Sequence, residues 1–214
     1  DGLRLDVAYC LDEHFLRRLH DFCKSLNADF WLLGELLHGD YNRWVNDQML
    51  DSCTNYECYK GLYSSFNSMN MFEIIHSLLR QFGPEQWTLY KGKHLLCFVD
   101  NHDVSRIATV LQNKRHLPVI YGLLFGMPGI PCVYYGSEWG EEADKSEGDP
   151  ALRASFEAPV DNELSEWIGK LAAAHRESEA LCSGSFRSVV LTNKQCIFER
   201  RTDAQRVLVA INAD

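Results

Sequence analysis

Hydrophobic positions along the chain alternate between short β-type runs and longer stretches with helical spacing. The β-type runs each end in polar residues and cover residues 2–7, 30–34, 95–99 and 130–135. In the stretches between them, apolar residues recur at steps of three and four, which predicts helices over residues 13–26, 71–82, 118–125 and 163–181. This alternation is typical of an α/β fold in which helices connect parallel strands.

The pattern changes after residue 181. Three strand-like runs, at residues 186–192, 196–201 and 206–212, are separated by the turn sequences Thr-Asn-Lys-Gln and Thr-Asp-Ala-Gln. We expect these runs to form the start of a separate antiparallel module, so that the chain divides into residues 1–181 and 182–214.

The composition of the chain limits the classes of molecule that it could bind. With 46% hydrophobic and 24% charged residues, the 214-residue chain is typical of a globular protein. A net charge of −9 argues against nucleic acid, whose phosphates need a basic surface. The longest apolar stretch, residues 117–135, is interrupted by glycines and prolines and does not predict a membrane span. The composition fits a neutral substrate.

The eight cysteines are irregularly spaced and include no C-x-x-C pair, which argues against a zinc or thioredoxin-type site. Cys10, Cys97, Cys132 and Cys196 lie in apolar or strand-like runs, so we expect them to be buried free thiols. Free thiols favour a reducing compartment, and we therefore expect a cytoplasmic protein.

Carboxylates follow the first two β-type runs. Alternation along the first run puts Arg4 and Asp6 on one face, where the guanidinium would stabilise the ionised carboxylate. On the second run Glu35 would lie above Trp31 and Leu33, in an apolar setting that favours the protonated acid.

The third β-type run ends in Asp100-Asn101-His102-Asp103. Because sites in parallel α/β folds form at the carboxyl ends of strands, Asp6, Glu35 and Asp103 are expected to converge there. An ionised carboxylate beside a protonated one is the pair that glycoside hydrolysis requires. Each residue alone would more often be a cap or a solvated loop charge, but three of them at successive strand ends favour a site.

Three strings resemble the alpha-amylase family, glycoside hydrolase family 13. They are Asp1-Gly2-Leu3-Arg4-Leu5-Asp6, Gly34-Glu35 and Phe98-Val99-Asp100-Asn101-His102-Asp103. Residues 129–138 are similar to the eighth strand of the family's barrel and the loop after it. The stretch from Gly34 to His38, with Asn55-Tyr56, resembles the neopullulanase and cyclomaltodextrinase branch.

The resemblance implies a retaining enzyme that cleaves α-1,4-glucosidic bonds of maltodextrins, cyclodextrins or starch fragments. It implies Asp6 as nucleophile, Glu35 as acid/base and Asp103 as the carboxylate that stabilises the distorted sugar. Arg4 and His102 would line the subsite of that sugar.

Three further residues are candidates for substrate binding. Asp149 and Arg153 match a D-P-x-x-R string that contacts the neighbouring sugar in that branch, and His38 would bind either substrate or a loop carbonyl. Among the aromatic residues, Trp44 is the best candidate to stack on a sugar, because it follows the Glu35 loop.

The resemblance also implies a partial (β/α)8 barrel. Residues 1–181 would supply strands four to eight, and residues 182–214 would begin the C-terminal β-sandwich. No cofactor is expected, since the usual calcium contacts of the family would lie upstream of Asp1. Five strands leave two open edges, so we expect self-association of the chain, and its activity alone is an open question.

Two alternatives stay open. The chain could be a non-catalytic protein of amylase fold used for assembly or interaction, although the three retained carboxylates speak against this. It could also be a metal-dependent hydrolase that uses His38 and His102 with the carboxylates, but no H-x-x-x-H or HExxH spacing supports a metal site.

Overall fold

Five short parallel strands run through the first two thirds of the molecule. The structure is a computed structural model that describes all 214 residues. β1 pairs with β2, β2 with β3, and β4 with β5, all in parallel, and a bridge between Thr54 and Leu96 connects β3 to β4. The strands are β1 (Gly2–Leu5), β2 (Trp31–Gly34), β3 (Ser52–Cys53), β4 (Leu96–Phe98) and β5 (Ile130–Cys132). Because all of these pairings are parallel, the carboxyl ends of the five strands lie at one edge.

Helices connect the strands. α1 shows how the sequence specifies one: the Asp12 side chain caps it by accepting a hydrogen bond from the Phe15 N–H at 3.0 Å, and Leu16 and Cys23 form its buried face. The helices are α1 (Glu13–Leu26), α2 (Tyr56–Asn67), α3 (Phe72–Phe82), α4 (Ile107–Val110), α5 (Leu117–Gly126), α6 (Asp149–Leu152), α7 (Glu163–Arg176) and α8 (Glu179–Ser183).

Several elements differ from the sequence-based expectation. The helix predicted over residues 163–181 is broken, because the Ser178 side chain accepts a hydrogen bond from the Leu181 N–H and starts a new helix there. α2 and β3 were not predicted. On α2 the buried face includes Cys58, Gly61 and Ser65, and these small or polar residues interrupt the apolar spacing.

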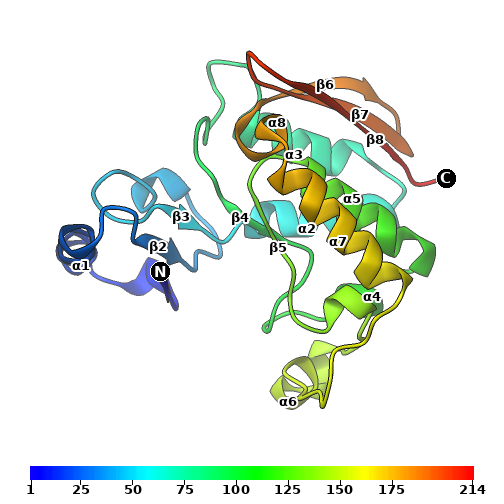
Figure 1. Ribbon diagram of the computed structural model, residues 1–214, viewed down its shortest axis with the longest axis horizontal. Helices are drawn as coiled ribbons and strands as arrows, with labels where there is room; N and C mark the ends of the chain where they lie inside the picture. Colours follow the sequence, from blue (N-terminus) through cyan, green and yellow to red (C-terminus); the bar gives the residue numbers. More distant parts are fainter.

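The C-terminal strands form an antiparallel sheet in the order β6-β7-β8. Their observed bounds, Ser185–Leu191, Gln195–Arg201 and Arg206–Asn212, agree with the prediction to within one residue at each end. Figure 1 shows this sheet lying over α3, α5 and α8, while α1 and β1–β3 form the opposite end of the molecule. Phe186 and Phe198 of the sheet belong to the same apolar core as Leu124 of α5.

All eight cysteines are free thiols. Cys97 and Cys196 are buried as expected, and Cys132 is half-buried. The expectation for Cys10 was wrong, because this residue ends the short 3₁₀ turn Ala8–Cys10 after β1 and is exposed. None of the helices combines the length and the apolar character needed to cross a bilayer.

Candidate active site

An open cleft of about 640 Å³ lies at the carboxyl ends of the parallel strands. Six of the eight predicted site residues line it, namely Arg4, Asp6, Glu35, His102, Asp103 and Arg153. They come from segments up to about 150 residues apart in the sequence, and the parallel strands bring these segments to one edge.

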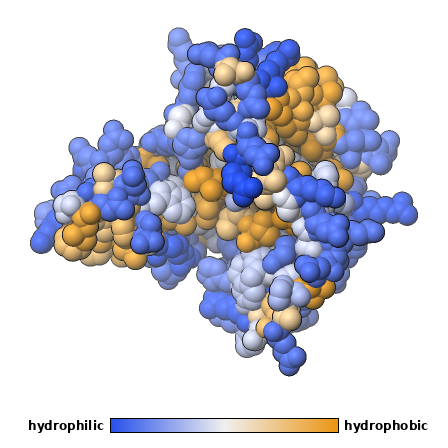
Figure 2. Space-filling view, viewed as in Figure 1, coloured by the Kyte–Doolittle hydropathy of each residue, from blue (hydrophilic) through white to orange (hydrophobic).

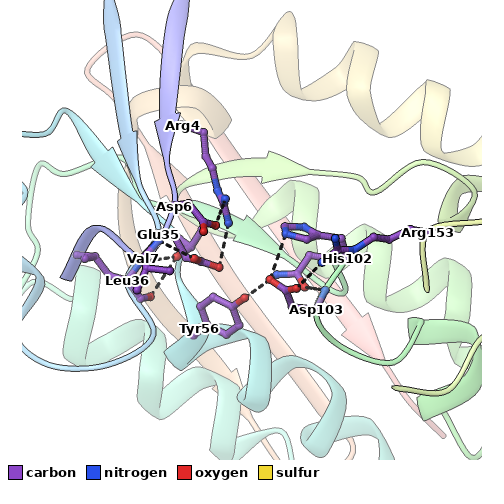
Figure 3. Close-up of polar contacts among 11 residues, drawn as sticks. Arg4, Asp6, Val7, Glu35, Leu36, Tyr56, His102, Asp103 and Arg153 are labelled. Atoms are coloured by element: carbon purple, nitrogen blue, oxygen red, sulfur yellow. Dashed lines mark hydrogen bonds and ion pairs between the residues drawn. The ribbon is translucent and has the colours of Figure 1, made fainter. Parts of the chain in front are cut away.

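One guanidinium connects the first two carboxylates. β1 and β2 pair in a register that sets Leu5 opposite Gly34, so Asp6 and Glu35 follow directly at neighbouring strand ends. Arg4 donates a hydrogen bond to Asp6 Oδ1 through Nη1, and its Nη2 lies 3.0 Å from Glu35 Oε1 (Figure 3). The pairing of Arg4 with Asp6 matches the alternation along the strand.

The surroundings of Glu35 differ from the apolar setting predicted. Its side chain is buried, yet Oε2 accepts a hydrogen bond from the Val7 N–H at 3.0 Å and Oε1 faces Arg4. Val7 adopts a left-handed conformation with φ of 46°, which is strained for a β-branched residue. This strained turn directs the Val7 N–H at the carboxylate, a contact that alternation along β2 does not reveal.

The opposite wall of the cleft carries a second charged group of residues. Asp103 accepts from Arg153 Nη2 at 3.1 Å on one oxygen, and His102 Nε2 lies 3.1 Å from the other. The loop is held in place by Asn101, whose Oδ1 accepts from the Asp103 N–H at 2.9 Å. Both carboxylate oxygens of Asp103 therefore have partners from the protein, and the carboxylate faces the Arg4 side of the cleft (Figure 3).

Tyr9 and Tyr56 line the cleft, and Trp44 does not. Trp44 is only 7% exposed and packs in the core, which rules out stacking on a sugar. Tyr56 begins α2, and its hydroxyl accepts a hydrogen bond from Asn101 Nδ2 at 2.8 Å. Burial raises the pKa of the Tyr56 hydroxyl. The sequence signal that could have placed Tyr56 at the start of a helix is Asn55, whose side chain caps α2.

Two predicted substrate-binding residues lie outside the cleft. His38 is exposed, with its ring centroid 5.6 Å from that of Tyr9, and lines an adjacent hollow of about 590 Å³ that Tyr56 also borders. Asp149 is exposed as well, with Oδ2 3.7 Å from Arg153 Nη2. No three His, Cys, Asp or Glu side chains are grouped closely enough to hold a metal ion.

Asp100, the first carboxylate of the Asp100–Asp103 string, points away from the cleft. Its Oδ2 accepts from the Ile107 N–H at 2.7 Å and from Ser137 Oγ at 2.8 Å, while the residue is only 1% exposed. Burial raises the pKa of Asp100 from 3.8 to about 6. The four-residue string thus divides into one buried structural acid and one that faces the cleft.

Replacing Asp100 by Asn should reveal this raised pKa as a pH dependence of stability. Because the folded protein holds the proton more tightly than the unfolded chain, Asp100 destabilises the wild type progressively as the pH rises from about 4 to 6. At about 1.4 kcal/mol per pH unit, the difference in unfolding free energy between wild type and Asp100→Asn should shift by up to about 3 kcal/mol in favour of the variant. Urea unfolding of both proteins at pH 4 and pH 7 measures this shift. The same difference in unfolding free energy at both pH values would contradict a raised pKa of Asp100.

Comparison with models of protein families identifies the family of this chain. A sequence model of the alpha-amylase catalytic domain matches residues 1–182, most of the chain. The chain belongs to the alpha-amylase family. This confirms the resemblance inferred from the three strings that carry Asp6, Glu35 and Asp103.

Relatives within the alpha-amylase family include a cyclomaltodextrinase of Thermoanaerobacter pseudethanolicus, 26% identical over 228 residues and matched by 99% of this chain. Neopullulanase 2 of Thermoactinomyces vulgaris is 28% identical over 222 residues and is also matched by 99% of the chain. The chain spans 37% of the length of each of these two proteins.

Solved structures of the family share the fold. A cyclomaltodextrinase structure superposes with a TM-score of 0.84 at 26% identity, covering 99% of this chain and 37% of that protein. The alpha-amylase of Geobacillus thermoleovorans, complexed with acarbose, superposes with a TM-score of 0.84 at 23% identity, covering all of this chain and 48% of the other. The alpha-amylase fold therefore extends over the whole chain.

Proposed function

We propose that the protein is a retaining glycoside hydrolase that cleaves α-1,4-glucosidic bonds of maltodextrins, cyclodextrins or starch fragments. One observation carries the proposal: the carboxylates of Asp6 and Glu35 are bridged by Arg4 at neighbouring strand ends, and Asp103 faces them across one cleft. Retaining glycosidases need a nucleophile and an acid/base only about 5–5.5 Å apart, and two carboxylates on one guanidinium are suited to that separation.

The reaction follows in two balanced steps. Asp6 attacks the anomeric carbon, the glycosidic C–O bond breaks, and Glu35 gives its proton to the leaving oxygen. Glu35, now ionised, takes a proton from water, and the water oxygen attacks the same carbon and releases Asp6. Asp103 would accept hydrogen bonds from the hydroxyls of the distorted sugar. Two inversions at one carbon give net retention.

The substrate class is supported by the relatives and by the walls of the cleft. The names of two relatives, cyclomaltodextrinase and neopullulanase, indicate α-glucan substrates. Arg4 and His102 would line the subsite of the distorted sugar, and Arg153 would contact the next one. His38 would act from the adjacent hollow, and Asp149 would act by orienting Arg153.

The family fold supports a proposal for the organisation of the chain. The five parallel strands would be strands four to eight of a (β/α)8 barrel, with residues 1–181 as its C-terminal part. Residues 182–214 would begin the C-terminal β-sandwich. The three-stranded antiparallel sheet of residues 185–212 fits that assignment, although it shares the apolar core with the helices.

Exposed apolar side chains on α1 support self-association. Phe15, Phe22 and Leu26 are 49%, 62% and 69% exposed, and Leu3 of the edge strand β1 is 44% exposed. Figure 2 shows the resulting hydrophobic surface on the α1 end of the molecule. Apolar surface next to an open strand edge favours contact with a second copy, or with further barrel strands.

Turnover of maltoheptaose and of β-cyclodextrin tests the proposed function. The α-anomer of the product should form first, because double displacement retains configuration, and proton NMR during the first minutes distinguishes the two anomers. Initial formation of the β-anomer would contradict retention. Absence of any turnover on both substrates would contradict the proposed activity of the chain.

A further inference from the structure

Arg106 is a buried cation behind the cleft. It follows Asp103 by three residues, has no exposed surface, and is not among the residues that line the cleft. No carboxylate pairs with its guanidinium directly; Asp100 is linked to it through Ser137, whose Oγ accepts from Arg106 Nη1 at 3.0 Å and donates to Asp100 Oδ2 at 2.8 Å. Burying an arginine in this way is costly unless its donors are well used.

The guanidinium joins its own loop to two other segments of the chain. Its Nη1 donates to the Tyr135 carbonyl and to Ser137 Oγ, the latter at 3.0 Å, and its Nη2 donates to the Leu152 carbonyl at 3.0 Å. The Tyr134 ring lies against it, with 4.3 Å between the guanidinium carbon and the ring centroid. A planar group with fixed donor directions can hold these segments in one geometry, which an ammonium cannot do.

Both members of the Arg153–Asp103 pair depend on these contacts. Leu152, whose carbonyl Arg106 holds, directly precedes Arg153. Asp103 lies on the loop that ends at Arg106, and Ser137 ties the start of that loop through its 2.8 Å hydrogen bond to Asp100. Arg106 therefore fixes the two segments whose side chains meet at 3.1 Å in the cleft.

We propose that Arg106 is a positioning residue that sets the Arg153–Asp103 pair for substrate. This rests on the proposed function and assigns to it a residue that does not touch the sugar. Small displacements of positioned groups cost large factors in rate, so a residue that fixes two of them should influence kcat/KM strongly.

A double-mutant cycle tests the proposal. Arg106→Lys should lower kcat/KM for maltoheptaose by about 10-fold or more. In an Arg153→Ala background the same substitution should cost clearly less than it does alone, because one of the two groups that Arg106 positions is gone. Arg115→Lys, at an exposed arginine nine residues later in the chain, should leave kcat/KM unchanged. Losses that simply multiply in the double variant would overturn the proposal.

Limited digestion with trypsin gives a second readout that does not need activity. Arg106→Lys should accelerate cleavage after Arg153 by about 10-fold and leave cleavage after Arg115 unchanged, since only the segment held through Leu152 is released. Equal acceleration at both sites, or at neither, would overturn the proposal. If the wild type shows no turnover, the proposed function fails, and the digestion alone decides the role of Arg106.

Discussion

Replacing Glu35 by Gln is expected to lower the turnover of maltoheptaose by about 10²–10⁴-fold, the range that general acid–base catalysis contributes. Gln has the shape of Glu and its carbonyl oxygen can still accept from the Val7 N–H, so the fold should persist. What it loses is the proton that the leaving oxygen requires. Initial rates, with circular dichroism to verify folding, measure the effect.

Two companion variants sharpen the result. Asp6→Asn should reduce turnover at least as much, because without the carboxylate no glycosyl-enzyme forms. Glu13→Gln is the matched control: Glu13 is an exposed carboxylate that pairs with Arg43 at 2.8 Å on the surface, and its loss should leave the rate unchanged. Wild-type rates in both Glu35→Gln and Asp6→Asn would exclude the proposed mechanism.

The largest loss of stability is expected from Phe198→Ala. Phe198 is fully buried in the C-terminal sheet, with its ring centroid 5.4 Å from that of Phe186, in the core shared with the helices. Truncating a buried phenylalanine leaves a cavity and costs about 3–5 kcal/mol. Urea unfolding followed by circular dichroism should show this loss in one transition, because the sheet and helices share a core.

Leu208→Ala is the matched control for that experiment. Leu208 lies on β8, next to β7, and is 55% exposed, so its truncation should change the unfolding free energy by no more than about 0.5 kcal/mol. Separate transitions for the sheet and for the helices would contradict a shared core. So would a loss below about 1 kcal/mol in Phe198→Ala.

Much of the fold could be predicted because its signals are local. α1 begins and ends at the residues that apolar spacing and the Asp12 cap indicate, and the three C-terminal strands lie where turns separate them. The prediction of one continuous helix over residues 163–181 was wrong, because apolar spacing there competes with a helix cap. The break after Arg176 depends on the Ser178 side chain, whose hydroxyl also donates to Gln205 on the connection between β7 and β8.

The candidate site shows the same limit. Alternation along a strand was enough to place Arg4 beside Asp6, because both lie on one short segment. Alternation could not predict the environment of Glu35, because its partners Arg4 and Val7 come from a neighbouring strand and a strained turn. Tyr56 lines the cleft from the start of α2, where its ring packs edge-on against Phe98 of β4, whereas Trp44 is buried in the core.

The sequence by itself determined four of the five parallel strands, the three C-terminal strands, the pairing of Arg4 with Asp6, and membership of the alpha-amylase family through its three strings. Only the tertiary structure decided that Asp100, in the same string as the predicted site residue Asp103, is buried and paired with Ile107 and Ser137. It also decided that Arg106 joins its own loop to the segments that carry Tyr135 and Leu152. The physical reason is that local spacing specifies helices and strands, whereas burial and polar partners depend on contacts between residues far apart in the chain.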